Sequence, residues 1–171
     1  MDHANIHPGT DPDPTDPALL AQAVRLASEN GDTGQLPFGA LVVRDGLILA
    51  TGVNTALKDL DPTAHAEVAA VRNACARLEV LHLTGTTIVS SCEPCAVCHA
   101  VAASVGVARI VYAAPKEIIP DLRYPAPGDN ATLMTGMQTG LRALAPEQIV
   151  YVPTDGADEP FRRYLAAREL S

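Results

Sequence analysis

Two short stretches contain the residue types that could do chemistry together. They are Ser91–Cys98, which reads SCEPCAVC, and His65-Ala66-Glu67 upstream of it. Cys95 and Cys98 are three residues apart, so on a helix both sulfurs lie on one face, one turn apart. With the histidine they could supply three ligands to one Zn²⁺ ion. Three protein ligands leave the fourth tetrahedral position open, as in catalytic zinc sites. The two stretches therefore predict a zinc hydrolase.

Glu67 is the carboxylate that could move protons at this site. Side chains two residues apart diverge by about 200° inside a helix. His65 and Glu67 can therefore share a site only if a helix begins there and the site lies against its end. Glu67 would then take a proton from water and pass it to the substrate. The alternative interpretation is a first-turn glutamate favoured only by the helix dipole.

The cysteine stretch also matches patterns from other classes of protein. From Cys95 it spells C-x-x-C-H, the signature of c-type haem attachment, and a C-x-x-C pair also occurs in redox proteins. With Cys92 it imitates three of the four cysteines of a ferredoxin cluster. None of these patterns uses the upstream histidine and glutamate, so zinc is the favoured interpretation. A non-catalytic structural zinc site, closed by Cys92, or a redox module remains the alternative.

The elements that must position these residues alternate between strands and helices. Asp45-Gly46 between two apolar runs predicts an antiparallel hairpin, and the strand–helix–strand order that follows predicts right-handed crossovers with helices covering a sheet. The fold class is therefore α/β. The expected strands are 40–43, 47–50, 86–90, 107–113 and 148–152, and the expected helices are 17–31, 65–78, 94–105, 131–144 and 158–170.

The chain of 171 residues is long enough for one domain with one hydrophobic core. Residues 1–14 contain three prolines and no hydrophobic periodicity, which predicts a disordered tail. The expected domain is 15–171. Within it, 114–130 is rich in proline and predicts a long connection without secondary structure, of the kind that often forms a lid.

Charge and composition exclude several classes of function. The formal net charge is −8, the isoelectric point is about 4.9 and only two lysines occur, which argues against nucleic acid as a partner. No run of apolar residues is long enough for a transmembrane helix, so no membrane partner is expected. No secretory signal is visible, and we expect a cytoplasmic protein.

The zinc motif resembles that of the zinc-dependent nucleobase deaminases of the cytidine deaminase-like superfamily, in which His-x-Glu precedes Pro-Cys-x-x-Cys. Longer runs resemble the guanine deaminase branch. These runs are Pro37-Phe38-Gly39-Ala40, Asn54, Pro62–Val68 and Ser91–Cys95. The resemblance covers about residues 17 to 113, and the metal motif is its most specific part.

The resemblance implies a three-layer α/β/α sandwich with a mixed, mostly parallel five-stranded sheet, and a homodimer in which the C-terminal regions can exchange. It implies a Zn²⁺ cofactor, held by His65, Cys95 and Cys98, with Glu67 moving protons. It also implies a small-molecule nucleobase as partner. The residues expected to bind the base are Asn54, the backbone of Ala66, and Phe38.

The resemblance stops near Ala114, so 114–171 is expected to be a divergent lid and C-terminal region. Guanine deaminases place an aspartate and an aromatic tail at the pocket there, and the residues available for such roles are Asp121, Tyr124, Phe161 and Tyr164. Guanine or a related aminated purine is the expected substrate. Cytosine, isoguanine and an aminotriazine would suit the same chemistry. The tRNA adenosine deaminases are disfavoured because their glycine- and lysine-containing run after the fourth strand is absent.

Overall fold

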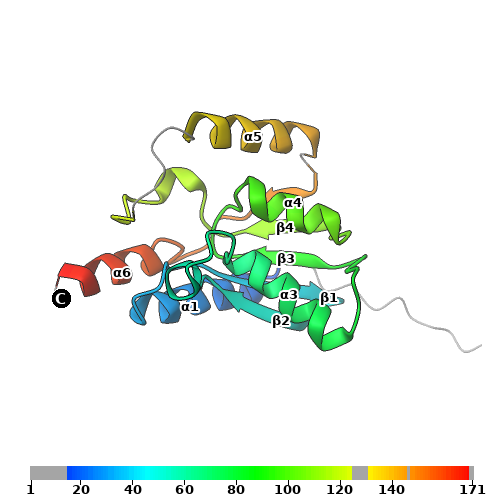
Figure 1. Cartoon of the computed structure of the whole chain (residues 1–171), viewed down its shortest axis with the longest axis horizontal. Coiled ribbons are helices and arrows are strands. Elements are labelled where there is room, and N and C mark those ends of the chain that lie inside the picture. The colour runs from blue at the N-terminus through cyan, green and yellow to red at the C-terminus, as the bar shows by residue number, and fades with distance from the viewer. Residues whose placement is uncertain (1–14, 125–130, 146, 170–171) are drawn as a thin grey trace, which may run out of the picture.

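The protein is a five-stranded mixed sheet covered by helices on both faces (Figure 1). The computed structural model describes residues 15–124, 131–145 and 147–169, so the predicted tail 1–14 lies outside the described residues. The strand order is β2-β1-β3-β4-β5. β1 pairs antiparallel with both β2 and β3, whereas β3, β4 and β5 pair in parallel. Four strands therefore point one way and β1 alone points the other way, which confirms the predicted sheet.

The hairpin of β1 (Gly39–Arg44) and β2 (Leu47–Val53) opens the sheet as predicted. Its turn residues Asp45 and Gly46 both have positive φ, 51° and 70°. Aspartate and glycine tolerate this conformation, and such a turn matches the twist of the two strands. The pairing register shifts once, between Val42 and Val43.

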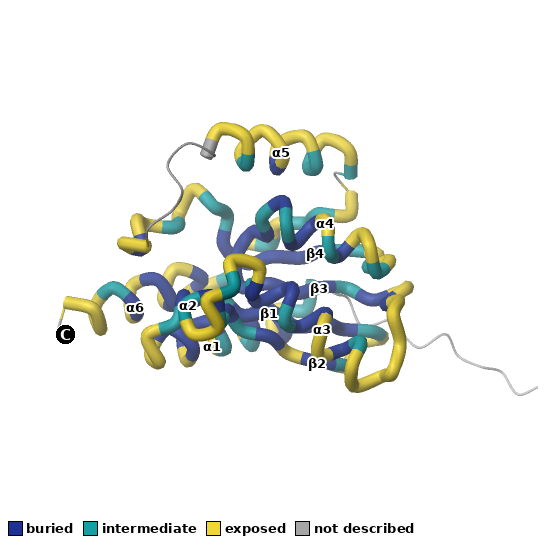
Figure 2. The backbone as a smooth tube through the Cα atoms, in the orientation of Figure 1, coloured by how far each residue is buried: buried dark blue, intermediate teal, exposed yellow. Residues whose placement is uncertain are grey.

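The two faces of β1 are buried in two different cores. Leu41 and Val43 face one core, together with residues of α1 (Pro17–Asp32) and α6 (Glu159–Glu169). Ala40 and Val42 face the other core, together with residues of α3 (Ala66–Leu78) and α4 (Ala96–Ser104). Alternate residues of a strand point to opposite faces, so this burial makes the sheet the middle layer of an α/β/α sandwich, as predicted. Figure 2 shows the strands as the buried centre of the molecule.

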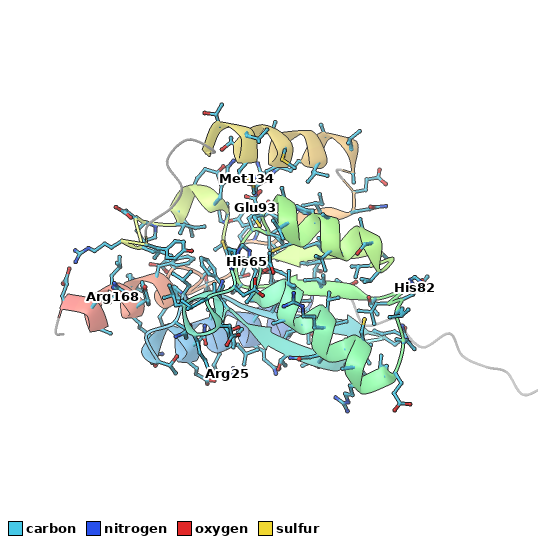
Figure 3. The ribbon with its side chains drawn as sticks, in the orientation of Figure 1. Arg25, His65, His82, Glu93, Met134 and Arg168 are labelled. Atoms are coloured by element: carbon cyan, nitrogen blue, oxygen red, sulfur yellow. The ribbon has the colours of Figure 1, made fainter. Side chains whose placement is uncertain are left out.

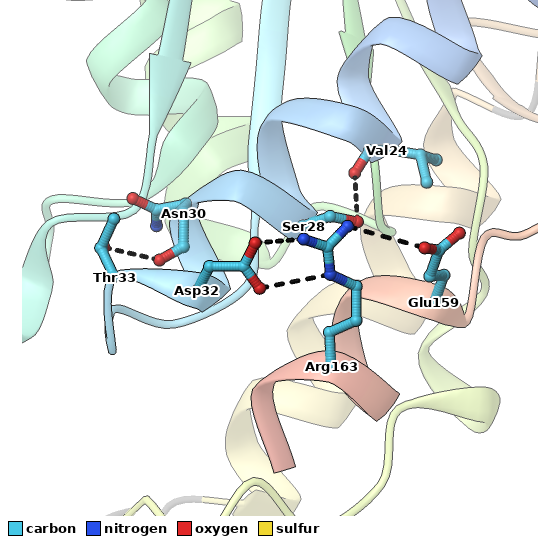
Figure 4. Close-up of polar contacts among 7 residues, drawn as sticks. All are labelled: Val24, Ser28, Asn30, Asp32, Thr33, Glu159 and Arg163. Atoms are coloured by element: carbon cyan, nitrogen blue, oxygen red, sulfur yellow. Dashed lines mark hydrogen bonds and ion pairs between the residues drawn. The ribbon is translucent and has the colours of Figure 1, made fainter. Parts of the chain in front are cut away.

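The two helices of the first layer, α1 and α6, are joined by a polar contact as well as by apolar packing. Arg163 of α6 pairs with Asp32 at the end of α1, and its Nε lies 3.2 Å from Asp32 Oδ1 (Figure 4). Glu159, one turn away on α6, lies 3.6 Å from the same guanidinium. Ion pairs this exposed contribute at most about 1 kcal/mol each, so the buried apolar contacts hold α6 in place.

The parallel half of the sheet consists of β3 (Thr87–Ser90), β4 (Arg109–Tyr112) and β5 (Ile149–Tyr151). α4 connects β3 to β4. A longer connection containing α5 (Ala131–Leu144) leads from β4 to β5, and α5 lies outside α4 (Figure 1). No helix among the described residues is both long and apolar enough to cross a membrane.

Two short elements lie where the sequence predicted only loops. α2 (Ala56–Asp59) follows the second strand, and a 3₁₀ turn, η1 (Lys116–Ile118), lies in the stretch predicted to lack secondary structure. They have four and three residues, which is too short for a hydrophobic period to be visible in the sequence. η1 supplies Lys116 to the lining of the cavity described below, whereas no residue of α2 lines that cavity.

Candidate active site

The two halves of the zinc motif meet because each stands at the start of a helix. His65 is the N-cap of α3 and Cys95 is the N-cap of α4, and both have extended backbone conformations. Cys98 lies one turn into α4. The described part of the chain contains one group of three or more potential metal ligands, namely His65, Cys95 and Cys98.

The spacing of the three ligand atoms fits a zinc ion. His65 Nδ1 lies 3.4 Å from Cys95 Sγ and 3.4 Å from Cys98 Sγ, and the two sulfurs are 3.7 Å apart. Tetrahedral bonds of about 2.0 Å to nitrogen and about 2.3 Å to sulfur require separations of about 3.5 Å and about 3.8 Å. Cys92 is not a member of the group. The geometry therefore gives no support to a fourth cysteine ligand that would close the site.

The charges of the ligand set also suit a cation. The pKa of Cys95 is lowered, to about 4, by the hydrogen bond from the Cys98 thiol and by the neighbouring His65. The hydrogen bond to Cys95 raises the pKa of His65 in turn. The hydrogen bond to Cys95 and burial raise the pKa of Cys98, so Cys95 is the sulfur of the pair that more readily carries negative charge. Thiolate sulfur and imidazole nitrogen are the donors that zinc prefers in proteins.

Glu67 lies in the first turn of α3 and is buried beside the ligand group. Its Oε1 accepts a hydrogen bond of 2.8 Å from Ser90 Oγ, and its Oε2 lies 3.2 Å from Cys98 Sγ. Burial raises the pKa of Glu67, although the bonds from Ser90 and Cys98 partly oppose that shift. Because the helix begins at residue 66, His65 and Glu67 share one site, as the sequence required. A carboxylate whose pKa is raised in this way can both take and give a proton during a reaction.

A cavity of about 440 Å³ opens in front of the ligand group and Glu67. Asn54, Ala66 and Phe38, the residues expected to bind a base, all line it. The orientation of Asn54 is fixed, because its Oδ1 accepts a hydrogen bond of 3.0 Å from the Ala56 backbone and its own carbonyl accepts one of 2.8 Å from Asn30 Nδ2. Asn54 Nδ2 is thus the atom left to face a ligand, so this amide offers a donor.

The four residues expected as lid or tail contacts separate into two pairs. Asp121 and Tyr124 line the cavity, on the segment that follows η1. Phe161 and Tyr164 do not line it. They are almost completely buried in the core between α6 and the sheet, where the Phe161 ring packs edge-on against Phe38 at 6.0 Å. Within one chain they lie behind the cavity wall, so their role as tail contacts stays a prediction.

Several cavity residues were not predicted from the sequence. The connection after β4 supplies Lys116, Ile119, Pro120 and Leu122, and α5 supplies Gln138. Glu93, inside the cysteine motif, also lines the cavity, and its carboxylate is bonded to α5. In Figure 3 the Glu93 side chain lies between His65 and α5. The only available signal for Glu93 was its position beside the ligands.

Comparisons with known proteins agree with this geometry. The family model described as the cytidine and deoxycytidylate deaminase zinc-binding region matches residues 14–114, which include all three ligands and Glu67. The chain is 47% identical over 81 residues to guanine deaminase from Bacillus subtilis, covering 47% of this chain and 52% of that protein. It is also 33% identical over 96 residues to a tRNA-specific adenosine deaminase from Aquifex aeolicus, covering 56% and 64%.

A solved structure extends the likeness over nearly the whole fold. Guanine deaminase from Nitrosomonas europaea superposes with a TM-score of 0.68 over 97% of this chain and 99% of that one, at 23% identity. That likeness establishes the arrangement of sheet and helices. The alignment with the B. subtilis protein spans about half the length of that relative.

Proposed function

Because the chain belongs to the family of the cytidine and deoxycytidylate deaminase zinc-binding region, we propose that it removes an amino group from a free nucleobase by hydrolysis. The single observation that carries the proposal is the constellation of three zinc ligands with Glu67 bonded beside them. A site with three protein ligands leaves room for a reacting molecule. A site of purely structural zinc would not need a buried carboxylate at its open side.

The roles of the residues follow from their positions. His65, Cys95 and Cys98 would hold the metal, and a zinc ion bound there would supply Lewis-acid activation of a water molecule. Glu67 would take a proton from that water, whose oxygen bonds to the amino-bearing carbon of the base, and would give the proton to the neighbouring ring nitrogen. It would then carry the second proton from the added hydroxyl to the amino group. The C–N bond breaks, ammonia leaves, and a carbonyl remains on the ring. Ser90 keeps the Glu67 carboxylate turned toward the ligands throughout.

Guanine, or a related aminated purine, is the proposed substrate. A guanine deaminase is 47% identical to the chain over 81 residues, and the cavity lies within the range of about 300–1,000 Å³ that is usual for small molecules. The donor of Asn54 suits the carbonyl or ring-nitrogen acceptors of such a base. Cytosine, isoguanine and aminotriazines carry the same amino carbon beside a ring nitrogen and are the alternatives.

A base within tRNA is the second candidate, because the chain is 33% identical to a tRNA-specific adenosine deaminase over 96 residues. The net charge of −8 disfavours tRNA as substrate, since binding a polyanion needs clustered positive charge.

We also propose that the protein works as a cytoplasmic homodimer. Analytical ultracentrifugation showing a monomer at micromolar concentration would contradict the dimer.

The experiment that tests the substrate measures ammonia release from guanine, adenine, cytosine, isoguanine, an aminotriazine and unmodified tRNA under the same conditions. We expect turnover of guanine or a close purine relative, and none of tRNA. Ammonia release from tRNA but from none of the free bases would favour the second candidate, a base within tRNA. If a zinc-loaded protein releases ammonia from none of these compounds, the proposed deaminase function is overturned.

A further inference from the structure

Glu93 is a fully buried carboxylate in the wall of the cavity, between Cys92 and the helix that carries the zinc ligands. Its side chain has no exposed surface. A buried charge is costly unless it is paired and hydrogen-bonded, so its partners show what the fold needs it for.

Those partners lie on η1, in the connection after β4, and on α5. Glu93 Oε1 accepts hydrogen bonds from Gln138 Nε2 at 2.7 Å and from Arg142 Nε at 2.6 Å, and Arg142 forms an ion pair with the same carboxylate. Gln138 and Arg142 are four residues apart and therefore lie on one face of α5. Glu93 Oε2 accepts a bond of 3.2 Å from the backbone of Lys116. One carboxylate thus holds both α5 and η1 against residues 91–95, the zinc loop between β3 and α4.

This anchoring fixes the orientation of the Gln138 amide. Nε2 donates to Glu93 and also to the carbonyl of Pro94, at 3.0 Å, so both of its hydrogens are used. If the amide were rotated by 180°, Gln138 Oε1 would face the carboxylate oxygen of Glu93 and the carbonyl oxygen of Pro94, and neither contact would have a hydrogen. Gln138 is 8% exposed and lines the cavity, and no donor among the described residues bonds to its Oε1. Gln138 therefore brings a fixed, unpaired acceptor to the cavity wall.

The cavity then offers two complementary amide atoms: the donor Nδ2 of Asn54 and the acceptor Oε1 of Gln138. A base that satisfies both must present one acceptor and one N–H. We propose that Gln138, positioned by Glu93 and Arg142, is a specificity residue that accepts a hydrogen bond from a ring N–H of the bound base. The inference rests on the proposed function. It assigns part of the substrate selection to α5, beyond the residues that the family model matches.

A buried acceptor left without a donor costs about 1–3 kcal/mol, which corresponds to about 5- to 150-fold in affinity. The test uses three probes: guanine, 2-aminopurine, which lacks the N1–H, and 9-methylguanine, which lacks the N9–H. Their binding is measured by calorimetry on the Glu67→Gln protein, which cannot turn them over. We expect one of the two analogues to bind about 5- to 150-fold more weakly than guanine.

The Gln138→Met change removes the acceptor and keeps the length of the side chain. In the Glu67→Gln background, Gln138→Met should make that same analogue bind as tightly as guanine. Thr139→Val, an exposed change on the same helix, should leave the difference in affinity between guanine and the analogue unchanged. Arg142→Met weakens the anchor but keeps the amide, so it should weaken all three probes by similar factors. In the active protein, Gln138→Met should raise KM for guanine more than it lowers kcat.

The outcomes separate this inference from the proposed function. If the wild-type protein turns over guanine but the Gln138→Met change leaves both analogue penalties as they were, the inference is overturned and the proposed function stands. A uniform weakening of all three probes by Gln138→Met would show a structural role only and would also overturn it. If the zinc-loaded wild-type protein turns over no base and binds none of the probes, both proposals fall.

Discussion

At the scale of single residues, the Ser90 hydroxyl is the group that holds Glu67 in place from the sheet. Ser90 Oγ donates a hydrogen bond of 2.8 Å to Glu67 Oε1, which leaves Oε2 to face the ligand group. We expect Ser90→Ala to lower kcat about tenfold, because a net hydrogen bond of about 1.5 kcal/mol to the reacting carboxylate is lost. Zinc content and KM should change little.

The matched control is Ser104→Ala at the exposed end of α4, where the hydroxyl bonds only to the carbonyl of Val101. It should leave kcat unchanged. Steady-state kinetics with elemental analysis of both variants check the prediction. A Ser90→Ala protein with full kcat would show that Glu67 is oriented without this bond.

The ligand set and Glu67 could be predicted because each residue type has few other uses at that spacing. His65 and Glu67 required a helix start, and the structure supplies one at residue 66. Gln138 could not be predicted, since a glutamine on an amphipathic helix carries no chemical signature. Phe161 and Tyr164 were expected at the pocket because an aromatic residue beside a site and one in a core look alike in a sequence.

At the scale of elements, Gly52 lets α3 approach the hairpin closely enough to set His65 and Glu67 against the sheet. A Cβ at Gly52 would lie 2.2 Å from Ala70 N and 2.3 Å from Ala66 O, both in the backbone of α3. We expect Gly52→Ala to lower the free energy of unfolding by about 1–3 kcal/mol, because the helix must move. It should also weaken zinc binding.

Gly136→Ala in α5 is the control, since among the described residues no atom outside its own stretch of helix lies within 4 Å of the added Cβ. This change should stabilise the helix by up to about 1 kcal/mol and leave zinc affinity unchanged. Urea unfolding of the two variants, with a competitive zinc titration, compares them. Equal stability and zinc affinity in Gly52→Ala and the wild type would contradict the close packing.

The strands and long helices could be predicted because hydrophobic periodicity and turn residues locate them. Asp45-Gly46 between two apolar runs located the hairpin, whereas the two buried faces of β1 became visible only in the structure. The packing of α5 could not be predicted, because its contact to the zinc loop depends on Glu93, Gln138 and Arg142, which are far apart in the chain. Long-range polar contacts of this kind leave no local pattern.

At the scale of the whole molecule, the zinc ligands join the starts of α3 and α4, which lie on the same face of the sheet. A metal that binds only the folded protein adds its binding free energy to stability. We expect a strong chelator to lower Tm by at least several degrees and Zn²⁺ to restore it. Cys95→Ser should have the low Tm with or without added zinc, whereas Cys75→Ser, outside the ligand group, should respond like the wild type.

Differential scanning calorimetry of these proteins with and without chelator makes the comparison. A wild-type Tm that the chelator does not change, together with a Cys95→Ser protein that still binds stoichiometric zinc, would contradict the assignment of the site.

The central claim is that Glu67 moves protons beside a zinc ion in a hydrolytic deamination. Its most direct test is ammonia release by Glu67→Gln, an isosteric change, in protein whose zinc content is measured in the same sample. The predicted result is one zinc per chain and a rate lowered by about 10²- to 10⁴-fold, as expected for loss of a general acid–base group. A Glu67→Gln protein with one zinc per chain and the wild-type rate would contradict the account.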